Sequence, residues 1–435
     1  MSKKVLLITY YWPPSGGAGV QRTLKFVKFL PEFGIESIVL TIDEKVAAYP
    51  FIDHSLLKDI SPDLKVVKTQ DLELLGKFKK LFPKVELPHS GFANHNKQTF
   101  KSKIMRFVRG NLLIPDARVS WVKSAYREAV RIIESENIDI FYISSPPHSS
   151  QLIGLKLKKR FPNKTWIADL RDPWTDIYFY KDMLHTLPAK KLDAAYERKV
   201  LQQADEILVA NDGIKKIFLK KNVAPDEKIH VIPNGFDEAD FGQPTHAQQD
   251  AFLITHTGTM AESYRPEVFF SVLKKIVEKH GNNIPIQGLF VGQVSESIPA
   301  MAEKYGLSNH VEFKGYVPHA EIIKFQKNAT CLLIAIPNTD NESNILPGKI
   351  FEYLAAKKPI LGIGTPDGDA GKIIAECEAG RMFNRDDEMG MFAFLEEKIA
   401  QWKISRNIDI VSAKADKYSR RNLTGKLSQI IHRKN

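Results

Sequence analysis

The residues best suited to chemistry lie between 344 and 360, where a loop with Pro347 and Gly348 leads into a helix and then a strand. Free backbone N–H groups and the helix dipole at such a helix start favour a phosphate. Glu352, which we expect about two turns along the helix, is placed to accept two ribose hydroxyls. The segment therefore predicts a site for a nucleotide diphosphate, with an ordinary loop–helix–strand unit as the alternative.

A run of glycines follows the first apolar segment, at Gly16, Gly17 and Gly19. Glycines let the backbone approach a ligand closely because no side chain intervenes. The spacing matches neither the G-x-G-x-x-G fingerprint nor a P-loop, which needs Gly-Lys-Ser/Thr. The run indicates either a ligand-binding loop or a tight strand–helix turn.

Polar residues also follow two later apolar segments of the first half. His148 comes after the segment 138–144, and the segment 165–168 is followed by Asp169, Arg171, Asp172 and Trp174. An isolated buried charge is costly, so these charges imply a pair or a ligand. We expect Asp169 to pair with Arg171, which leaves Asp172 and Trp174 for the hydroxyls and the ring face of a sugar. A core histidine is the alternative for His148.

The second half offers cations for the diphosphate. Gly258 ends the strand expected at 251–257 and lets a phosphate approach, while Arg265 and Lys349 supply positive charge. Such charge would neutralise the oxygens of a bound diphosphate. Asp367 and Asp369 have the spacing of a metal-binding pair, but they lie among turn residues and are expected to lead into a helix. We therefore expect no metal site.

Apolar segments alternate with helical patterns along the chain, which predicts parallel sheets covered by helices on both faces. The fold class is accordingly α/β, with two doubly wound, Rossmann-like domains. The expected strands of the first domain are 5–9, 35–41, 138–144, 165–168, 206–210 and 230–232, with helices at 121–136 and 187–204. Those of the second domain are 251–257, 286–291, 311–313, 331–336 and 360–363.

Turn and polar residues between 234 and 250 form the best linker. We therefore place the first domain at 1–241, joined by a C-terminal helix at about 412–435, and the second domain at 250–411. Two doubly wound domains imply a cleft between them, and ligands bind at the carboxyl ends of their strands.

The segments 4–22, 142–174, 230–237 and 344–363 resemble the retaining glycosyltransferases of family 4, which have the two-domain GT-B fold, in particular those of bacterial cell-surface polysaccharide synthesis. The resemblance covers nearly the whole chain. It departs from the family at Asn344, where a glutamate usually precedes Glu352 by eight positions. It also departs at Thr259 and Tyr264, where many members have Arg and Lys.

The resemblance implies a role for each residue of interest. The first domain binds the acceptor through Arg171 and Trp174, and His148 and Asp172 act on the transferred sugar. The second domain holds the nucleotide sugar, for which UDP is favoured over GDP, and no cofactor is expected. The implied donor-binding residues are Gly16, Gly17, Gly19, Gly258, Arg265, Asn344, Leu346, Lys349 and Glu352.

The chain of 435 residues has a net charge of +11, which favours an anionic partner. Basic residues concentrate within about 77–112, where an apolar stripe recurs at helical spacing. This stretch suits either an amphipathic helix on an anionic membrane or a surface helix packed on its own domain. Cys331 and Cys377 form no disulfide framework, and no apolar stretch approaches the length of a membrane span, so we expect a cytoplasmic protein. The first alternative for 77–112 would place it at the inner face of the plasma membrane.

The function predicted from these residues is transfer of a sugar from a nucleotide-diphosphate sugar to a saccharide or lipid-linked acceptor, without a metal. Alternatives are another GT-B enzyme such as a sugar-nucleotide 2-epimerase, or a partner subunit that binds nucleotide but has lost activity. We expect no binding of nucleic acid, because the basic and aromatic residues form no stacking motif or recognition helix.

Overall fold

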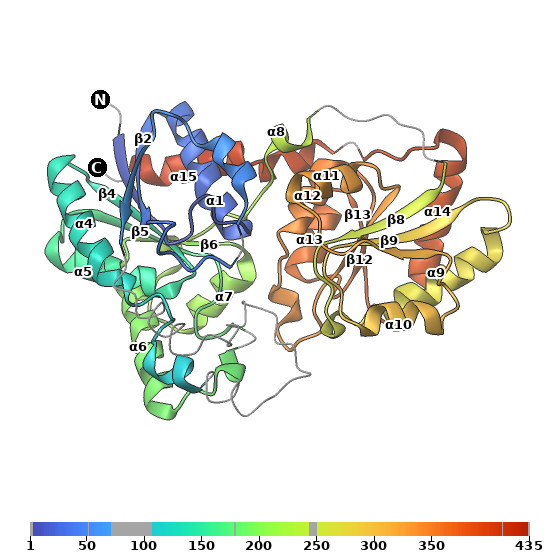
Figure 1. The fold of residues 1–435 in the computed structure, drawn as a ribbon, viewed down its shortest axis with the longest axis horizontal. Helices are drawn as coiled ribbons and strands as arrows, with labels where there is room; N and C mark the ends of the chain where they lie inside the picture. Colours follow the sequence, from blue (N-terminus) through green and yellow to red (C-terminus); the bar gives the residue numbers. More distant parts are fainter. Residues whose placement is uncertain are drawn as a thin grey trace. The chain divides into compact units, whose positions relative to one another are not determined.

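The computed structural model describes residues 3–50, 52–70, 107–177, 180–242, 250–410 and 412–433. The chain forms two compact units, Met1–Pro233 with Leu423–Asn435 and Asn234–Asn422 (Figure 1). We had placed the division at 241–250 and the return to the first domain at about 412. The predicted α/β class with two doubly wound units is confirmed.

The first unit is built on a parallel sheet of seven strands in the order β3-β2-β1-β4-β5-β6-β7. Its strands are buried runs of apolar residues, as expected of a sheet covered on both faces. β3 was not anticipated, because its sequence KVVKT is short and charged at an edge of the sheet. The bounds are β1 Lys3–Ile8, β2 Ile35–Ile42, β3 Lys65–Thr69, β4 Ile140–Ser145, β5 Thr165–Leu170, β6 Glu206–Val209 and β7 Ile229–Val231.

Helices cover both faces of this sheet and bury one apolar core on each. The helices α4, α5, α6 and α7 pack on one face, and α1 and α15 pack on the other (Figure 1). The C-terminal helix therefore belongs to the core of the first unit. The bounds are α1 Ala18–Phe29, α4 Trp121–Ser135, α5 Gln151–Arg160, α6 Leu187–Gln203, α7 Asp212–Lys220 and α15 Arg420–Arg433.

The second unit repeats the same topology with six parallel strands in the order β10-β9-β8-β11-β12-β13. β13 was not anticipated, because it is a short edge strand that begins with Gly380 and Arg381. The bounds are β8 Phe252–Thr257, β9 Ile286–Val291, β10 Val311–Phe313, β11 Cys331–Ala335, β12 Ile360–Ile363 and β13 Gly380–Phe383.

Two cores again lie on the two faces of this sheet. One face is covered by α9, α10 and α14, and the other by α11, α12 and α13 together with α8. The bounds are α8 Glu238–Phe241, α9 Glu267–His280, α10 Ser297–Lys304, α11 His319–Lys327, α12 Lys349–Ala356, α13 Asp369–Glu376 and α14 Glu388–Ser405.

The helix expected between about 410 and 431 is interrupted. A 3-10 helix at Ala413–Tyr418 precedes α15, and Ser419 between them is extended. The interruption arises because the chain pairs there with Phe236, whose N–H donates to Tyr418 and whose carbonyl accepts from Arg420. None of the described helices is long and apolar enough to cross a membrane. Most of the basic stretch 77–112 lies outside the described residues.

Candidate functional site

Both sheets reverse their strand order at one point, which is where open α/β sheets bind ligands. The reversal lies between β1 and β4 in the first unit and between β8 and β11 in the second. The sequence-predicted residues follow these strands or their neighbours. The two strand ends are described in turn.

Asp169, the fifth residue of β5, is held by Arg22 of α1 rather than by Arg171. Arg22 Nε and Nη2 donate to the two carboxylate oxygens at 3.0 and 2.9 Å, and neither side chain is exposed. Arg22 Nη1 also donates to the carbonyls of Ile232 and Pro233 at 2.7 and 2.9 Å. The expected Asp169–Arg171 pair is therefore wrong, because Arg22 is the guanidinium that enters the core beside β5.

Two further donors complete the shell around Asp169. The hydroxyl of Tyr142 donates to its carboxylate at 2.5 Å, and that of Ser144 at 3.3 Å. Burial raises the pKa of Tyr142, and the neighbouring carboxylate raises it further. Burial opposes the charge of Arg22, but Asp169 nonetheless raises the pKa of its guanidinium. Both members of this buried pair thus have several hydrogen-bond partners, as a structural ion pair requires.

Arg171 lies across the start of α1. A Cβ atom at Gly19 would stand 2.1 Å from Arg171 Nη1, so a larger residue there would displace the guanidinium. Arg171 donates from Nε to the carbonyl of Ser145 at 3.1 Å and from Nη2 to that of Pro146 at 3.0 Å. Gly17 caps the same helix with φ of 105°. Gly19 thus makes room for the guanidinium of Arg171. Direct contact of Gly16, Gly17 and Gly19 with the nucleotide sugar stays a prediction.

His148 follows β4 in a short 3-10 helix and stacks on the ring of Trp174, with centroids 4.7 Å apart and planes at 11°. Burial lowers its pKa to about 4, so the imidazole is neutral at physiological pH. Its Nδ1 is buried and has no hydrogen-bond partner among the described residues. Asp116 fixes the turn by accepting from the backbone N–H and the hydroxyl of Ser149, both at 2.8 Å.

Trp174 provides the ring on which His148 stacks. Its side chain is 2% exposed, and its Nε1 donates to Asp193 of α6 at 2.7 Å. Asp193 also accepts from the hydroxyl of Tyr180 at 2.8 Å, and burial raises its pKa to about 6. The sequence did not point to Asp193. With one ring face against His148, direct contact of Trp174 with an acceptor sugar stays a prediction.

Asp172 is partly buried in the neighbourhood of Arg171 and Asp169. Burial raises its pKa, although the nearby Arg171 acts in the opposite direction. Within the described part of the chain its carboxylate makes no hydrogen bond. Such a carboxylate is suited to accept from a hydroxyl of a bound sugar.

In the second unit, Lys349 at the start of α12 lies over Gly258 at the end of β8. A Cβ atom at Gly258, where φ is +94°, would stand 2.3 Å from Lys349 Cε. Lys349 Nζ donates to the carbonyl of Thr259 at 3.3 Å. Burial lowers the pKa of this amine to about 8, and the nearby Glu352 partly offsets that shift. A desolvated cation beside a glycine and a helix start is suited to a phosphate.

Glu352 is held by Gln326 of α11. Gln326 Nε2 donates to Glu352 Oε2 at 2.8 Å and to the hydroxyl of Thr257 at 3.1 Å. We expected Glu352 two turns into the helix, but α12 begins at Lys349, so Glu352 lies in its first turn. Gln326 is fully buried and was missed, because nothing in the sequence links α11 to α12.

The remaining residues predicted to bind the nucleotide sugar are exposed or partly buried. Arg265 is exposed in a left-handed conformation after a 3-10 helix. Asn344 ends another 3-10 helix, and Leu346 packs partly buried on an apolar core. Asp369 is the first residue of α13, as expected for a helix lead-in.

The loop that carries Asn344 is fixed by an ion pair that the sequence analysis missed. Arg385 Nη1 donates to Glu342 Oε2 at 2.7 Å, and Arg385 Nη2 donates to the carbonyl of Ile336 at 2.5 Å. The other oxygen of Glu342 accepts from the hydroxyl of Thr365 at 3.1 Å. Glu342 is therefore occupied in holding the loop after β11.

Two family models match consecutive parts of the chain. Glycosyltransferase Family 4 matches residues 89–240, and Glycosyl transferases group 1 matches residues 237–407. The chain belongs to the family 4 glycosyltransferases. The two matches meet near the boundary between the two units.

Among curated proteins, a putative teichuronic acid biosynthesis glycosyltransferase of Bacillus subtilis, TuaH, is 22% identical to this family 4 chain over 203 residues. The match covers 46% of this chain and 50% of that relative, so the chain spans about half the length of the curated relative it matches.

The solved structures establish the fold, which is GT-B. Anabaena HepE in complex with UDP has a TM-score of 0.62 and 12% identity, covering 99% of this chain and 100% of that one. The same protein was solved with UDP-glucose. Sucrose-phosphate synthase from Thermosynechococcus elongatus has a TM-score of 0.64 and 13% identity, covering 99% and 98%.

Proposed function

We propose that this family 4 member is a retaining glycosyltransferase that moves a sugar from a UDP-sugar to a saccharide or lipid-linked acceptor in cell-surface polysaccharide synthesis. The observation that carries the proposal is the group at the end of β8, where Lys349 lies over Gly258 and Gln326 holds Glu352 on the first turn of α12. In this proposal Lys349 and the helix start take the diphosphate, and Glu352 accepts the ribose hydroxyls.

The chemistry proposed here needs no metal. Positive charge from Lys349 and the N–H groups at the start of α12 stabilises the leaving diphosphate as the bond to the sugar breaks. The leaving phosphate takes the proton of the acceptor hydroxyl on the same face of the sugar, which retains the configuration. His148, neutral because its pKa is about 4, acts as a hydrogen-bonding partner of the transferred sugar rather than as an acid. Asp172 and Arg171 orient the acceptor.

The known proteins support the nucleotide and the acceptor class in this proposal. HepE carries UDP in one structure and UDP-glucose in another, and the name of the Bacillus subtilis relative places it in teichuronic acid biosynthesis. We extend both to this chain by analogy. The nucleotide is proposed from those complexes, and the polysaccharide acceptor from that relative.

We also propose that the protein acts at the inner face of the plasma membrane through residues 77–112. Among the basic residues of that stretch, Arg109 lies within the described part of the chain. It is partly buried, and burial lowers its pKa in the neighbourhood of Asp116 and Arg118. A vesicle test should therefore replace Lys101, Lys103 and Arg106 by Glu and leave Arg109 in place. Weaker co-sedimentation with anionic vesicles than wild type supports the proposal, and equal co-sedimentation contradicts it.

The direct test of the function is a thermal-shift screen of nucleoside diphosphates and their sugars, followed by a transfer assay with EDTA. A ligand stabilises by RT ln(1 + [L]/Kd), so UDP at about 100 times its Kd should add about 2.7 kcal/mol. We expect UDP to shift the melting temperature more than GDP and expect transfer to persist in EDTA. Loss of transfer that Mg²⁺ restores would contradict metal independence, and conversion of the donor without an acceptor would indicate an epimerase.

A further inference from the structure

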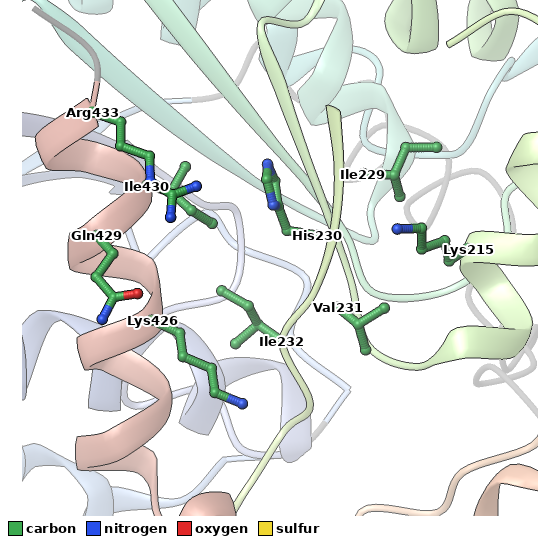
Figure 2. A pocket seen from close by; sticks show the side chains of 9 residues that line it. All are labelled: Lys215, Ile229, His230, Val231, Ile232, Lys426, Gln429, Ile430 and Arg433. Carbon is green, nitrogen blue, oxygen red and sulfur yellow. The ribbon is translucent and has the colours of Figure 1, made fainter. Parts of the chain in front are cut away.

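A groove of about 340 Å³ runs along the outer edge of the sheet in the first unit, where β7 is the last strand (Figure 2). None of the side chains that line this groove belongs to the candidate site described above, and the sequence analysis named none of these residues as a site residue. Its walls come from β7, α7 and α15. The lining residues are Lys215, Ile229, His230, Val231, Ile232, Lys426, Gln429, Ile430 and Arg433.

The strand at the bottom of the groove has an open edge. β7 pairs with β6 alone, and Ile232 N–H donates to Val209 on that side at 2.9 Å. Because backbone groups of successive residues point to opposite sides of a strand, the N–H and C=O of Val231 point away from β6. Within the described residues, they have no hydrogen-bond partner. The N–H of Ile229 already donates to Asp226. The free N–H and C=O of Val231 on this edge strand are therefore the point at which another strand could pair.

Side chains line the groove on both faces of the sheet. His230 and Ile232 point toward α15, and Ile229 and Val231 point toward α7, as the alternation of a strand requires (Figure 2). An added strand would alternate in the same way. Its side chains would therefore meet α15 and α7 in turn.

The charge of the groove is positive. Lys426, Gln429 and Arg433 form one exposed stripe of α15, and Figure 2 shows Lys426 and Arg433 extending from the helix toward β7. On the other walls, Lys215 pairs with Asp226 at 3.0 Å and His230 with Glu206 at 2.5 Å. No acidic side chain is among the lining residues, so the two α15 cations are left to attract an anion.

We propose that this groove binds an extended acidic segment of a partner protein, which adds to β7 as an eighth strand. Main-chain hydrogen bonds at Val231 would give affinity, and carboxylates facing Lys426 and Arg433 would give specificity. The two cations are seven residues apart, which is about 10 Å along a helix. Carboxylates two to four residues apart on one face of a strand span about 7–13 Å, which brackets that separation. A second copy of this chain is disfavoured, because its own basic groove would face an identical charge.

The experiment uses the full-length protein and a fluorescein-labelled peptide of alternating Glu and Val, read by anisotropy. We expect saturable binding, and we expect the double variant Lys426→Glu/Arg433→Glu to weaken it about tenfold or more. The same peptide with N-methyl groups on alternate amides should also lose about tenfold, because it cannot complete the strand pairing. The matched control, Lys403→Glu/Lys304→Glu, makes the same charge change at exposed positions of the second unit and should bind as wild type does.

Melting temperature with and without UDP shows that each variant is folded. Equal affinity of wild type and Lys426→Glu/Arg433→Glu would overturn the proposal, and so would the absence of saturable binding. Equal affinity of the N-methylated peptide would show that charge alone accounts for the binding, and it would also overturn the proposed strand pairing. Stronger competition by a single-stranded oligonucleotide or by anionic vesicles than by unlabelled peptide would assign the groove to another class of partner.

Discussion

The two strand ends use charge in opposite ways. In the first unit, Arg22 and Asp169 are fully buried, paired twice and surrounded by further donors. In the second unit, Lys349 makes one hydrogen bond at 3.3 Å to a carbonyl, and burial lowers its pKa by more than the nearby Glu352 raises it. The first arrangement is satisfied without a ligand. The second carries a desolvation cost that an anionic ligand would offset.

This difference distinguishes charged groups that stabilise the fold from charged groups that are available to a ligand. Both groups lie at the carboxyl ends of parallel strands, so position does not separate them. The partners do, since the Arg22 guanidinium makes four hydrogen bonds to protein oxygens with its five N–H donors, while the Lys349 amine makes one with its three. His148 falls between the two cases, because its ring is stacked but its Nδ1 lacks a partner among the described residues.

The largest effect should come from breaking the scaffold pair. Asp169→Asn leaves Arg22 buried without its charge partner and should lower the free energy of unfolding by about 3–5 kcal/mol. Urea denaturation measures this. Arg22→Met/Asp169→Leu should recover much of the loss, because neither charge is then buried alone. As a control, Arg131→Gln breaks the exposed pair with Glu128 and should leave the free energy of unfolding nearly unchanged, because water screens that pair. A loss as small for Asp169→Asn would remove the contrast between the units.

Next in size is His148→Ala, which should lower kcat about a hundredfold and change the donor KM little, as for a contact made mainly in the transition state. Steady-state kinetics and the melting temperature are measured on the same preparation. Trp174→Phe keeps a ring under His148 but loses the hydrogen bond to Asp193, so it should reduce stability more than kcat. Normal turnover of His148→Ala with a lower melting temperature would make this histidine part of the core and Asp172 the next candidate.

Glu352→Gln should weaken UDP-sugar binding by about 1.5–3 kcal/mol, the scale of a hydrogen bond to a charged group. Calorimetric titration gives the Kd. Gln326→Ala should weaken binding less, because it frees Glu352 without removing its charge. The exposed Glu378→Gln is the matched control, for which no change is expected. An unchanged Kd for folded Glu352→Gln would rule out the ribose contact.

The smallest effect concerns pH. The pKa of Lys349 is lowered to about 8, so its amine loses charge as pH rises through 8. UDP affinity should therefore be full below that value and fall about tenfold between pH 7.5 and 9, since binding must then take up a proton. Lys349→Arg keeps its charge and should remove this dependence. The same slope in wild type and Lys349→Arg would show that another group titrates.

Sequence patterns predicted the parts of the fold that depend on local periodicity. The strands 286–291, 311–313 and 360–363 have the expected bounds, because buried apolar runs between turns are clear signals. The edge strands β3 and β13 carry charge or glycine and gave no such signal. Extended Ser419 could not be foreseen either, because its conformation depends on pairing with Phe236, far away in the sequence.

Residue types at strand ends likewise located the candidate site, but their partners could not be read from the chain. Asp169 was recognised as a charge in need of a pair, yet Arg22 is 147 positions away. Gln326 and Asp193 were missed for the same reason, because a buried amide or carboxylate on a helix has no local signature. Tertiary packing decides which charge is satisfied and which is left to bind.

Hydrogen–deuterium exchange with and without UDP tests the contrast between the two strand ends most directly. At the start of α12, the N–H groups of Gly348 and Lys349 have no hydrogen-bond partner among the described residues, whereas those of Ile350 and Phe351 donate to the carbonyls of Pro347 and Gly348 at 3.2 Å. The first two should exchange fast until a phosphate accepts from them. We predict that UDP slows exchange first and most strongly at 257–260 and 347–353. Protection confined to 9–22 or 145–174, with none at the start of α12, would contradict the assignment of the nucleotide to the second unit.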